Sequence, residues 1–409
     1  MIGRRPWMMG LGARLLTVGA GGAALADAVQ AAPAGGNASR GTPAKPSGAA
    51  LTLSRAPLVF PRDHGSHPET QVEWWYVTGV LRPAGTGAGR SRPAQDLAEP
   101  PAYGFQLTFF RVRRELDRPL DSRFAPSQIM LAHVAVTDLA RRRMHHDQHL
   151  LRQGFANAFT DETDTRVRLG DWWLVRSPGP QGLSRYRLAF RSQPANVALS
   201  LTLDAPLPPL LQGREGWSQK GPQPEQASRY VSEPQLSGQG QLAVDGQTPQ
   251  AVQAQCWLDH EWSQAYLGSG SDDSSSRAVG WDWLGLNLLD GSALMLFQMR
   301  RRDGSTLWTG GTWRSATGGQ QNLEGQLLFE PLAYWSSPTS LSRYPVQWRV
   351  RTPKGVFRIE AMLETQEVDA RRTTGFLYWE GVVRVLDDAG TLRGWGYLEM
   401  TGYAGRVPL

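Results

Sequence analysis

Short stretches of alternating apolar and polar residues recur along most of this 409-residue chain, and they constrain its fold more than any other feature. They are rich in Trp, Tyr, Val, Leu and Phe, and Gly, Pro and Asp separate them at short intervals. A period of two is typical of strands with one buried face, and closely spaced turn residues are typical of antiparallel sheets. Beyond the first 31 residues no long helical period is present. The sequence therefore predicts an all-β protein.

The chain also resembles itself weakly on either side of residues 268–277, a small, polar run that we interpret as an inter-domain loop. Five pairs of segments occur in the same order: 73–81 with 280–288, 103–111 with 293–300, 171–175 with 346–350, 230–244 with 378–390, and 254–262 with 393–403. A repeat of this length indicates duplication of a whole structural unit. We therefore predict two related antiparallel barrels in tandem, over residues 55–267 and 278–409.

The first 31 residues are typical of an export signal. Arg4 and Arg5 precede a mildly apolar run rich in Gly and Ala, and residues 24–26 (ALA) offer a cleavage site. The paired arginines favour the twin-arginine route, with a retained N-terminal anchor as the alternative. Residues 32–54 have the composition of a flexible linker. We therefore expect an exported protein, periplasmic or associated with the envelope.

Composition excludes several classes of function. Most of the formal charge of +6 lies in the first 50 residues, so nothing indicates a nucleic-acid partner. Cys256 is the only cysteine, which excludes an intrachain disulfide and a thiolate-rich zinc site, and we expect it to be buried and inert. The chain lacks the phosphate-loop, dinucleotide and serine-nucleophile motifs.

The seven histidines all lie at or before His260. Residues 145–149 (HHDQH) follow three arginines, and a solvated loop explains them better than a metal site, so no metal is predicted. His260 belongs to the run WLDHEW (257–262), whose counterpart near Glu399 has no histidine. Asp259 we interpret as architectural, because Glu399 repeats the acid. A histidine that only completes a strand end and a catalytic histidine both fit His260.

Alternation also predicts which way side chains face. Asp282 is in phase with the leucines of 280–288, which places a carboxylate at a barrel mouth or inside it. Trp281 lies on the opposite face. In 73–81, Glu73 and Trp75 share the apolar face. The tryptophans and Tyr76 of this stretch either line a ligand cavity or pack the core.

Three stretches, HPETQVEWWYVTG (67–79), WLDHEWS (257–263) and GWDWLGLNLLDGSALMLFQMR (280–300), resemble the carotenoid 1,2-hydratase (hydroxyneurosporene synthase) family. They equally resemble its relatives, the secreted attachment-type lipocalin-like proteins found with ABC transporters. The similarity extends over roughly residues 55–405. It implies two tandem lipocalin-like (calycin) antiparallel β-barrels, an apolar ligand cavity and no metal or organic cofactor.

The resemblance also implies roles for single residues. His260 and Trp262 match the family's histidine and tryptophan, Asp282 matches its aspartate, and Gly280 stands where its tyrosine is expected. Asp282, desolvated and protonated, would donate a proton to a double bond; Trp262 would stabilise the carbocation, and His260 would hold or deprotonate the attacking water. The residues expected to line the cavity are Glu73, Trp75, Tyr76 and Trp281.

Three functions follow as hypotheses. The first is acid-catalysed hydration of an isoprenoid-type double bond, which makes the protein a hydro-lyase. The second is a non-catalytic carrier of an apolar ligand or lipid that works with an ABC transporter, and the third is a structural envelope protein. An apolar ligand would be delivered from a bilayer, so a membrane surface or a transporter permease is an expected contact of the first two.

Overall fold

The computed structural model describes residues 53–84, 97–113, 127–264, 278–405 and 407. The predicted export signal at 1–31, nearly all of the linker at 32–54 and the inter-domain loop at 268–277 lie outside the described residues. The expectations that depend on them, export among them, stay predictions. No helix among the described residues is long and apolar enough to cross a membrane.

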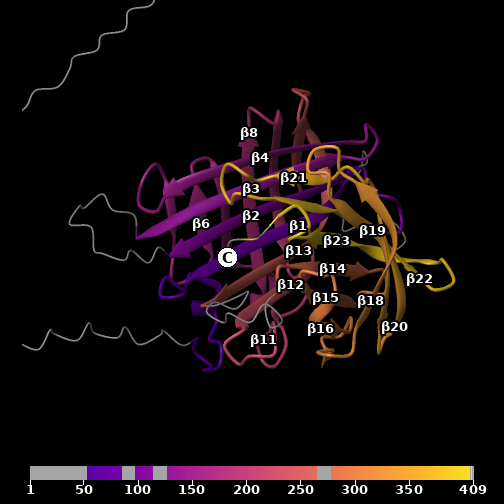
Figure 1. The fold of residues 1–409 in the computed structure, drawn as a ribbon. Helices are drawn as coiled ribbons and strands as arrows, with labels where there is room; N and C mark the ends of the chain where they lie inside the picture. The colour runs from indigo at the N-terminus through magenta and orange to yellow at the C-terminus, as the bar shows by residue number, and fades with distance from the viewer. Residues whose placement is uncertain (1–52, 85–96, 114–126, 265–277, 406, 408–409) are drawn as a thin grey trace, which may run out of the picture. The chain divides into compact units, whose positions relative to one another are not determined.

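The described residues form antiparallel strands and two short 3₁₀ helices, η1 (Arg62–His64) and η2 (Pro180–Gly182). The strands make two barrel-like sheets, one a nearly closed barrel and the other a half-barrel. This confirms the all-β class and the tandem arrangement of two antiparallel barrel-like sheets. Figure 1 shows the first sheet in indigo to pink and the second in orange to yellow.

The first sheet has the order β4-β3-β2-β1-β13-β12-β9-β8-β7-β6-β5, with β10 and β11 paired to β12. Its strands are β1 (Val72–Pro83), β2 (Tyr103–Arg113), β3 (Gln128–Asp138), β4 (Arg143–Arg152), β5 (Ala158–Thr160), β6 (Arg166–Leu169), β7 (Trp172–Pro178), β8 (Ser184–Ser192), β9 (Val197–Asp204), β10 (Leu210–Leu211), β11 (Trp217–Gln219), β12 (Ala227–Val244) and β13 (Gln250–Ser263).

The second sheet has the order β17-β16-β15-β14-β23-β22-β20-β19-β18, with β21 paired to β22. Its strands are β14 (Gly280–Leu288), β15 (Ala293–Arg300), β16 (Thr306–Arg314), β17 (Gln320–Asn322), β18 (Leu328–Ser336), β19 (Arg343–Thr352), β20 (Gly355–Ala361), β21 (Glu367–Asp369), β22 (Leu377–Asp387) and β23 (Leu392–Met400).

The two sheets repeat the same strand order. The run β3-β2-β1-β13-β12-β9-β8-β7 of the first corresponds to β16-β15-β14-β23-β22-β20-β19-β18 of the second. Four of the five predicted segment pairs fall on corresponding strands. The fifth is wrong by one strand, because 171–175 belongs to β7 while 346–350 belongs to β19, the counterpart of β8. Both segments contain tryptophan but neither has a distinctive turn beside it. The sequence therefore did not determine which strands should be paired.

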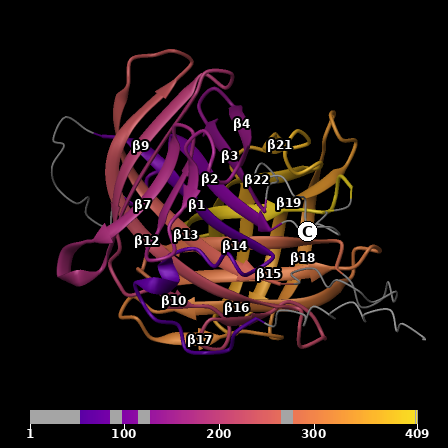
Figure 2. The same cartoon turned by 90° about the vertical axis from the view of Figure 1, so that its left-hand side faces the viewer.

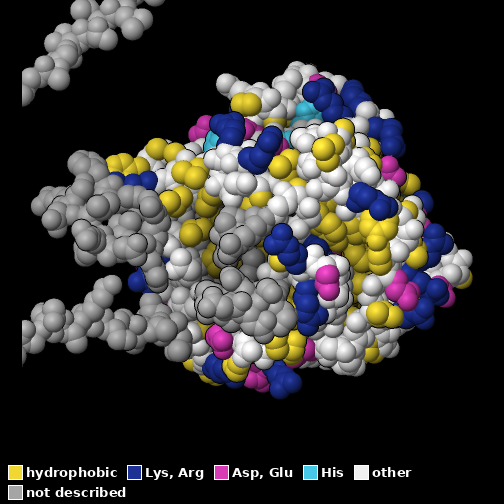
Figure 3. All heavy atoms as spheres, in the orientation of Figure 1, with side chains coloured by type: hydrophobic (Ala, Val, Ile, Leu, Met, Phe, Trp, Pro, Cys, Tyr) yellow, Lys and Arg dark blue, Asp and Glu magenta, His cyan; other side chains and the backbone are white. Residues whose placement is uncertain are grey.

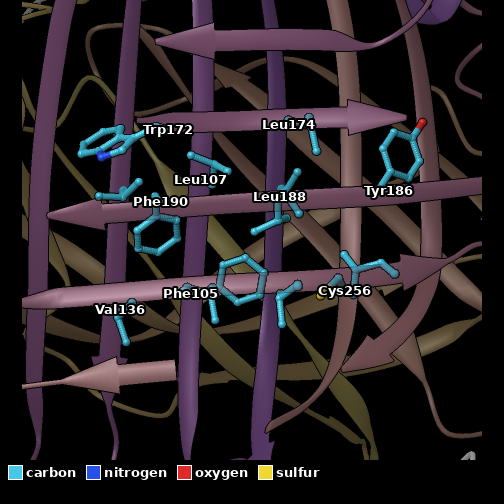
Figure 4. Packing of buried hydrophobic residues seen from close by; sticks show 14 of the residues in the cluster. Phe105, Leu107, Val136, Trp172, Leu174, Tyr186, Leu188, Phe190 and Cys256 are labelled. Carbon is cyan, nitrogen blue, oxygen red and sulfur yellow. The ribbon is translucent and has the colours of Figure 1, made fainter. Parts of the chain in front are cut away.

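Two core clusters fill the sheets and a third joins them. The first sheet encloses aromatic and aliphatic side chains from β1 to β13, among them Trp172, Phe105 and the buried Cys256 (Figure 4). Burial raises the pKa of the Cys256 thiol, which confirms the expected buried cysteine. The second sheet packs its leucines around Trp348 and Trp379. The third cluster takes side chains from both sheets.

Direct contacts between the sheets hold this third cluster in place. Gly104 on β2 lies so near β22 that a Cβ atom there would be 2.9 Å from Val382 Cβ. Thr137 on β3 donates a hydrogen bond to Gln366 Oε1 at 2.9 Å. In both views β13 and β14 run beside one another (Figure 2). The backbones of β2 and β22 can approach each other at Gly104 because glycine has no side chain.

Two expected loops contain strands. Residues 145–149 lie in β4, where His145 is buried and bonds to the Ala195 carbonyl oxygen, and His149 stacks on Trp172. Residues 212–228, a polar run whose composition also favours a loop, contain β11 and the start of β12. In both cases pairing with a neighbouring strand outweighs a polar local sequence. On the face in Figure 3, Lys and Arg side chains are interspersed with Asp and Glu instead of forming one basic area.

Candidate active site

A cavity of about 40 Å³ lies between the two sheets, inside the cluster that both share. Its walls are β1, β2, β12 and β13 on one side and β14, β22 and β23 on the other. The residues that line it are Trp74, Tyr76, Thr108, Phe110, Tyr230, Asp259, Glu261, Trp281, Trp283, Tyr378, Glu380 and Glu399. Seven of these are aromatic and four are acids, so the cavity combines an apolar wall with carboxyl groups.

Strand register fixes the wall that the first sheet contributes. Tyr76 on β1 lies opposite Asp259 on β13, and Asp259 lies opposite Ser232 on β12. One step along the same face, Trp74 lies opposite Glu261. Residues directly opposite in antiparallel strands share a face, so each row presents an aromatic ring and an acid side by side.

In the second sheet Glu380 on β22 lies directly opposite Glu399 on β23, and Glu399 lies opposite Trp283 on β14. Glu380 is buried, and Glu399 is partly exposed. Like charges directly opposite each other repel strongly where water is excluded. A pair placed in this way holds at least one proton more readily than two isolated acids would.

The pKa values of this pair reflect their surroundings. Burial raises the pKa of Glu399 to about 8, and the Trp281 side chain offsets part of that rise. Burial and the neighbouring Glu399 raise the pKa of Glu380 well above its ordinary value. Tyr76 lies near enough to lower it slightly, yet the Tyr76 hydroxyl and Glu380 Oε1 meet no partner in hydrogen-bonding geometry. The surroundings of the pair therefore favour the protonated forms of both acids.

Asp259 has a different environment. Its oxygens accept hydrogen bonds from Tyr230 Oη at 2.6 Å, Ser232 Oγ at 2.5 Å and Trp257 Nε1 at 2.7 Å. Trp283 Nε1 in turn donates to Tyr230 Oη at 2.8 Å. Burial raises the pKa of Asp259 to about 7, but these three donors favour the ionised form and oppose the rise. The surroundings of Asp259 therefore favour its ionised form more than those of Glu380 and Glu399 favour theirs.

The fourth acid, Glu261, has its own cation. Lys220 Nζ lies 2.9 Å from Glu261 Oε1, and both side chains are buried. The ammonium also lies over the rings of Tyr230, at 4.7 Å, and Phe297, at 4.2 Å. Burial raises the pKa of Glu261 and lowers that of Lys220, because it penalises both ions, while their mutual attraction opposes each shift.

A second polar cluster lies on the other face of β1 and β13. Glu73 Oε1 is 2.9 Å from His67 Nδ1 and 2.9 Å from His260 Nε2, and Arg111 Nε donates to Glu73 Oε2 at 2.8 Å. Burial favours the neutral form of Glu73, but the hydrogen bonds from the two histidines and the charge of Arg111 outweigh it and hold the pKa far below its ordinary value. Glu73 is a carboxylate.

The same cluster has the donor set of a metal site, since ligand atoms of His67, Glu73 and His260 lie within 4.8 Å of one another. Arg111 already supplies the positive charge that Glu73 requires. Burial lowers the pKa of His67, but hydrogen bonds to Asp63 and Glu73 raise it overall, which favours the imidazolium. Arg111 and the His67 imidazolium already balance the charges of Glu73 and Asp63, so the donor set does not fit a metal ion.

The structure brings His260 and Trp262 together but not Asp282. His260 stacks on Trp75 at 4.7 Å and lies 4.8 Å from Trp262, within the Glu73 cluster. Asp282 lies on the core face of the second sheet, ion-paired to Arg300 at 2.8 Å. Alternation is the reason: Asp282 points away from the cavity, while Trp281 and Trp283 point into it. Burial raises the pKa of Asp282, and Arg300 opposes the rise.

Of the four residues expected to line the cavity, Tyr76 and Trp281 do so. Glu73 and Trp75 point to the opposite face of β1, where Trp75 belongs to the core of the first sheet. The catalytic roles assigned from sequence to His260, Trp262 and Asp282 stay predictions.

Sequence reasoning missed the acids that line the cavity. The repeat paired Asp259 with Glu399, and the pairing was interpreted as architectural; the structure places both at one cavity. Tyr230 and Tyr378, which begin the paired segments 230–244 and 378–390, also line it. The repeat itself was the available signal. Polar residues recur at matching positions of the two copies, and these positions lie at the interface between them.

The fold and the cavity define a class of tandem β-sheet proteins with an acidic and aromatic cavity between the sheets. The AttH-like family model matches residues 52–403, so the chain belongs to the AttH-like family. No curated protein matches the chain. The structure is similar to a crystal structure assigned as an AttH from Nitrosomonas europaea, with 38% identity, a TM-score of 0.73, and coverage of 87% of this chain and 100% of that one.

A second solved structure shares the fold. Kievitone hydratase from Nectria haematococca has a TM-score of 0.59 and 16% identity, and the match covers 85% of this chain and 94% of that chain. At this identity the likeness concerns the arrangement of strands.

Proposed function

We propose that the protein is a hydratase, a hydro-lyase that adds water by acid catalysis to an isoprenoid-type double bond of an apolar small molecule in the cavity between the sheets. The observation that carries the proposal is the pair Glu380–Glu399, directly opposite each other on β22 and β23 with raised pKa values, in the same cavity as the hydrogen-bonded Asp259. The fold likeness to kievitone hydratase supports the reaction class, and the family resemblance supports the isoprenoid.

The first step is protonation of an alkene carbon. Burial raises the pKa of a carboxyl group and so keeps it protonated at neutral pH, where a solvated carboxylate would have no proton to donate. The Glu380–Glu399 pair transfers one proton, the C=C π electrons form the new C–H bond, and the adjacent carbon becomes a tertiary carbocation. The pair is left with one negative charge more.

Aromatic rings and carboxylates stabilise that cation. Trp74, Trp281 and Trp283 line the cavity, and a desolvated ring face stabilises a cation by about 2 kcal/mol. Water then attacks the cationic carbon. Asp259, which three donors keep ready to ionise, accepts a proton from that water as the C–O bond forms. The proton then returns to the Glu380–Glu399 pair, so atoms and charge balance.

A binding protein for an apolar ligand is the second candidate. The observation that favours it is the aromatic lining, which would hold an apolar ligand without any reaction. The export and the ABC-transporter or membrane partner that go with this proposal are untested. Recovery of an unmodified ligand from purified protein, with no conversion of added alkenes, would favour the carrier over the hydratase.

The test is to incubate the protein with a panel of acyclic isoprenoids and prenylated aromatics in ¹⁸O-labelled water and to detect the labelled alcohol by mass spectrometry. We expect Glu399→Gln to reduce the rate by about 10²-fold or more, since a general acid contributes this much. Glu330→Gln on β18, outside the cavity, is the matched control and should retain activity. Product formed at the wild-type rate by a Glu380→Gln/Glu399→Gln double variant would exclude the mechanism.

A further inference from the structure

A row of polar side chains leads from the cavity across the first sheet. Thr108 on β2 lines the cavity and lies opposite His133 on β3, and His133 lies opposite Gln148 on β4. Residues directly opposite in antiparallel strands share a face, so the three side chains are neighbours. His133 is buried, and its ring meets Phe110 of the cavity wall edge to face. The proposed reaction uses neither His133 nor Gln148.

The imidazole of His133 lies between two hydroxyl groups of the second sheet. Its Nδ1 is 2.9 Å from Tyr378 Oη on β22, and its Nε2 is 2.8 Å from Thr373 Oγ1, between β21 and β22. Burial lowers the pKa of His133 to about 3, so the ring is neutral. A neutral imidazole has one N–H donor and one acceptor nitrogen. One of the two hydroxyl groups therefore donates to the ring, and the other accepts from it.

The other partners of Thr373 decide which hydroxyl accepts. Gln148 Nε2 donates to the carbonyl oxygen of Asp369 at 2.5 Å, which fixes the amide with its Oε1 toward Thr373. Thr373 Oγ1 lies 2.8 Å from this Oε1 and 3.1 Å from the carbonyl oxygen of Ala370. Both of these atoms can only accept, so the single hydroxyl proton of Thr373 goes to one of them. The Thr373 oxygen is left to accept from His133.

This fixes the role of Tyr378. The proton of His133 is on Nε2, so Nδ1 accepts the hydrogen bond from the Tyr378 hydroxyl. Tyr378 then has no proton for a second partner, and any further hydrogen bond at its oxygen must be donated to it. Tyr378 is 4% exposed and lines the cavity, two residues from Glu380 on the same strand. A further donor to Tyr378 therefore comes from the cavity.

The cavity has the size and the polarity that suit water. One water molecule needs roughly 10–15 Å³ measured in the same way, so 40 Å³ holds about three. A buried water ordinarily makes about three hydrogen bonds to the protein. Besides Tyr378, the carboxyl groups of Asp259, Glu380 and Glu399 line the cavity and can bond to water. Water is therefore the donor that fits beside Tyr378.

We propose that His133 is a positioning residue and that it makes Tyr378 a hydrogen-bond acceptor toward the cavity, where Tyr378 holds the water that attacks the cation. Thr373 and Gln148 fix the ring in this form. The inference rests on the proposed function and deepens it, because it names the residue that orients the water. A water that donates one hydrogen to Tyr378 keeps a lone pair for the cationic carbon. Its other proton goes to Asp259, and Tyr378 neither gains nor loses one.

The tautomer of His133 is measured on the full-length protein labelled with ¹⁵N-histidine, because the ¹⁵N chemical shifts of the two ring nitrogens show which one carries the proton. The His133 signals are those that shift in Thr373→Val and stay in place in Thr374→Val. Thr374 is the matched control, since its hydroxyl also donates to the Ala370 carbonyl oxygen, at 3.1 Å. Loss of the same signals in His133→Gln identifies them independently. We expect a proton on Nε2 alone, and a proton on Nδ1 overturns the proposal.

Kinetics in the labelled-water assay test the water. Tyr378→Phe removes one hydrogen bond to it and should lower kcat about tenfold with KM little changed, because the lost contact is not with the ligand. Thr373→Val should lower kcat by a smaller factor, and Thr374→Val should retain it. Wild-type kcat in Tyr378→Phe, or equal kcat in the two threonine variants, overturns the proposal and leaves the hydratase standing. A KM that rises only for substrates with a hydroxyl group makes the ligand the donor and overturns it too.

Failure of the proposed function is a separate outcome. If the wild type forms no labelled alcohol, a crystal structure that shows ordered water decides. A water within hydrogen-bonding distance of Tyr378 Oη, lost in Tyr378→Phe, supports the water site and the role of His133 while the hydratase is refuted. No water at that oxygen in the wild type overturns the proposal whatever the activity.

Discussion

The buried carboxyl groups of this protein fall into two sets with opposite charge states. Glu73 receives hydrogen bonds from two histidines and an arginine and is held ionised. Glu399, which is partly exposed, lies opposite another acid, and its raised pKa favours the neutral form. Because burial alone raises the pKa of both, the charge state of each is decided by its neighbours across the strands.

Stability should depend on pH through Glu399. Its pKa is about 8 in the folded protein and near 4.5 in the unfolded chain, so between these values the folded state retains a proton that the unfolded state has lost. Its contribution to stability is full below about pH 4.5 and is lost as pH rises through 8. We expect Glu399→Gln to gain on the wild type over this range, by up to about 1.4 kcal/mol per pH unit, in urea unfolding. Parallel pH profiles of the two proteins would contradict this.

Glu73 stabilises the folded protein in its ionised form, whereas Glu399 does so in its neutral form. Glu73→Gln leaves Arg111 buried without a counter-charge and the His67 imidazolium with Asp63 alone, and we expect a loss of about 3–5 kcal/mol in the free energy of unfolding. The double variant Glu73→Gln/Arg111→Gln should lose less than the sum of its single variants, as coupled residues do. Strict additivity in that cycle would show that the cluster is not an ion-pair network.

At the scale of the elements, the alternation of side chains was predictable and the partners across strands were not. The period of two correctly placed Asp282 with the leucines of β14 and Trp281 on the other face. It also places His260 and Asp259, adjacent in sequence, on opposite faces, but it could not show which side chains each would contact. Nor could it show that Glu380 lies opposite Glu399, because the register of two strands depends on the turns and bulges between them.

The contact between β2 and β22 gives a test of how the sheets are joined. Gly104→Ala places a Cβ 2.9 Å from Val382 Cβ, which forces one strand to move and should cost about 1–3 kcal/mol in thermal or urea unfolding. Gly104→Ala/Val382→Gly should lose less than the sum of its two single variants, because Val382→Gly removes the Cβ that the new methyl group meets. If Val382→Gly adds its own full cost to that of Gly104→Ala, the two strands do not meet there.

At the scale of the whole molecule, each sheet has an apolar face besides its own core. The face of the second sheet that bears Trp281, Trp283, Phe297 and Tyr378 packs against the first sheet. The sequence showed two related units but not which faces meet, because both faces of β14 are apolar: its residues are all buried.

This arrangement predicts that the second sheet is not soluble alone. A fragment of residues 278–409 exposes the shared face, and we expect it to aggregate or bind a hydrophobic dye, as judged by gel filtration and fluorescence. Co-expression with residues 53–264 should restore a soluble complex. A monomeric fragment that unfolds cooperatively without its partner would contradict the importance of this interface.

Because the two sheets share one strand order within a single chain, the two walls of the cavity can acquire different residues. Corresponding strands of the two sheets face one another across it, as the same patch would in a homodimer. In a dimer every substitution would occur on both sides at once. In a single chain each side mutates alone, so one half can present Asp259 with three donors and the other two adjacent glutamates. A proton acceptor and a proton donor can then occupy opposite walls, an asymmetry that two identical subunits could not encode.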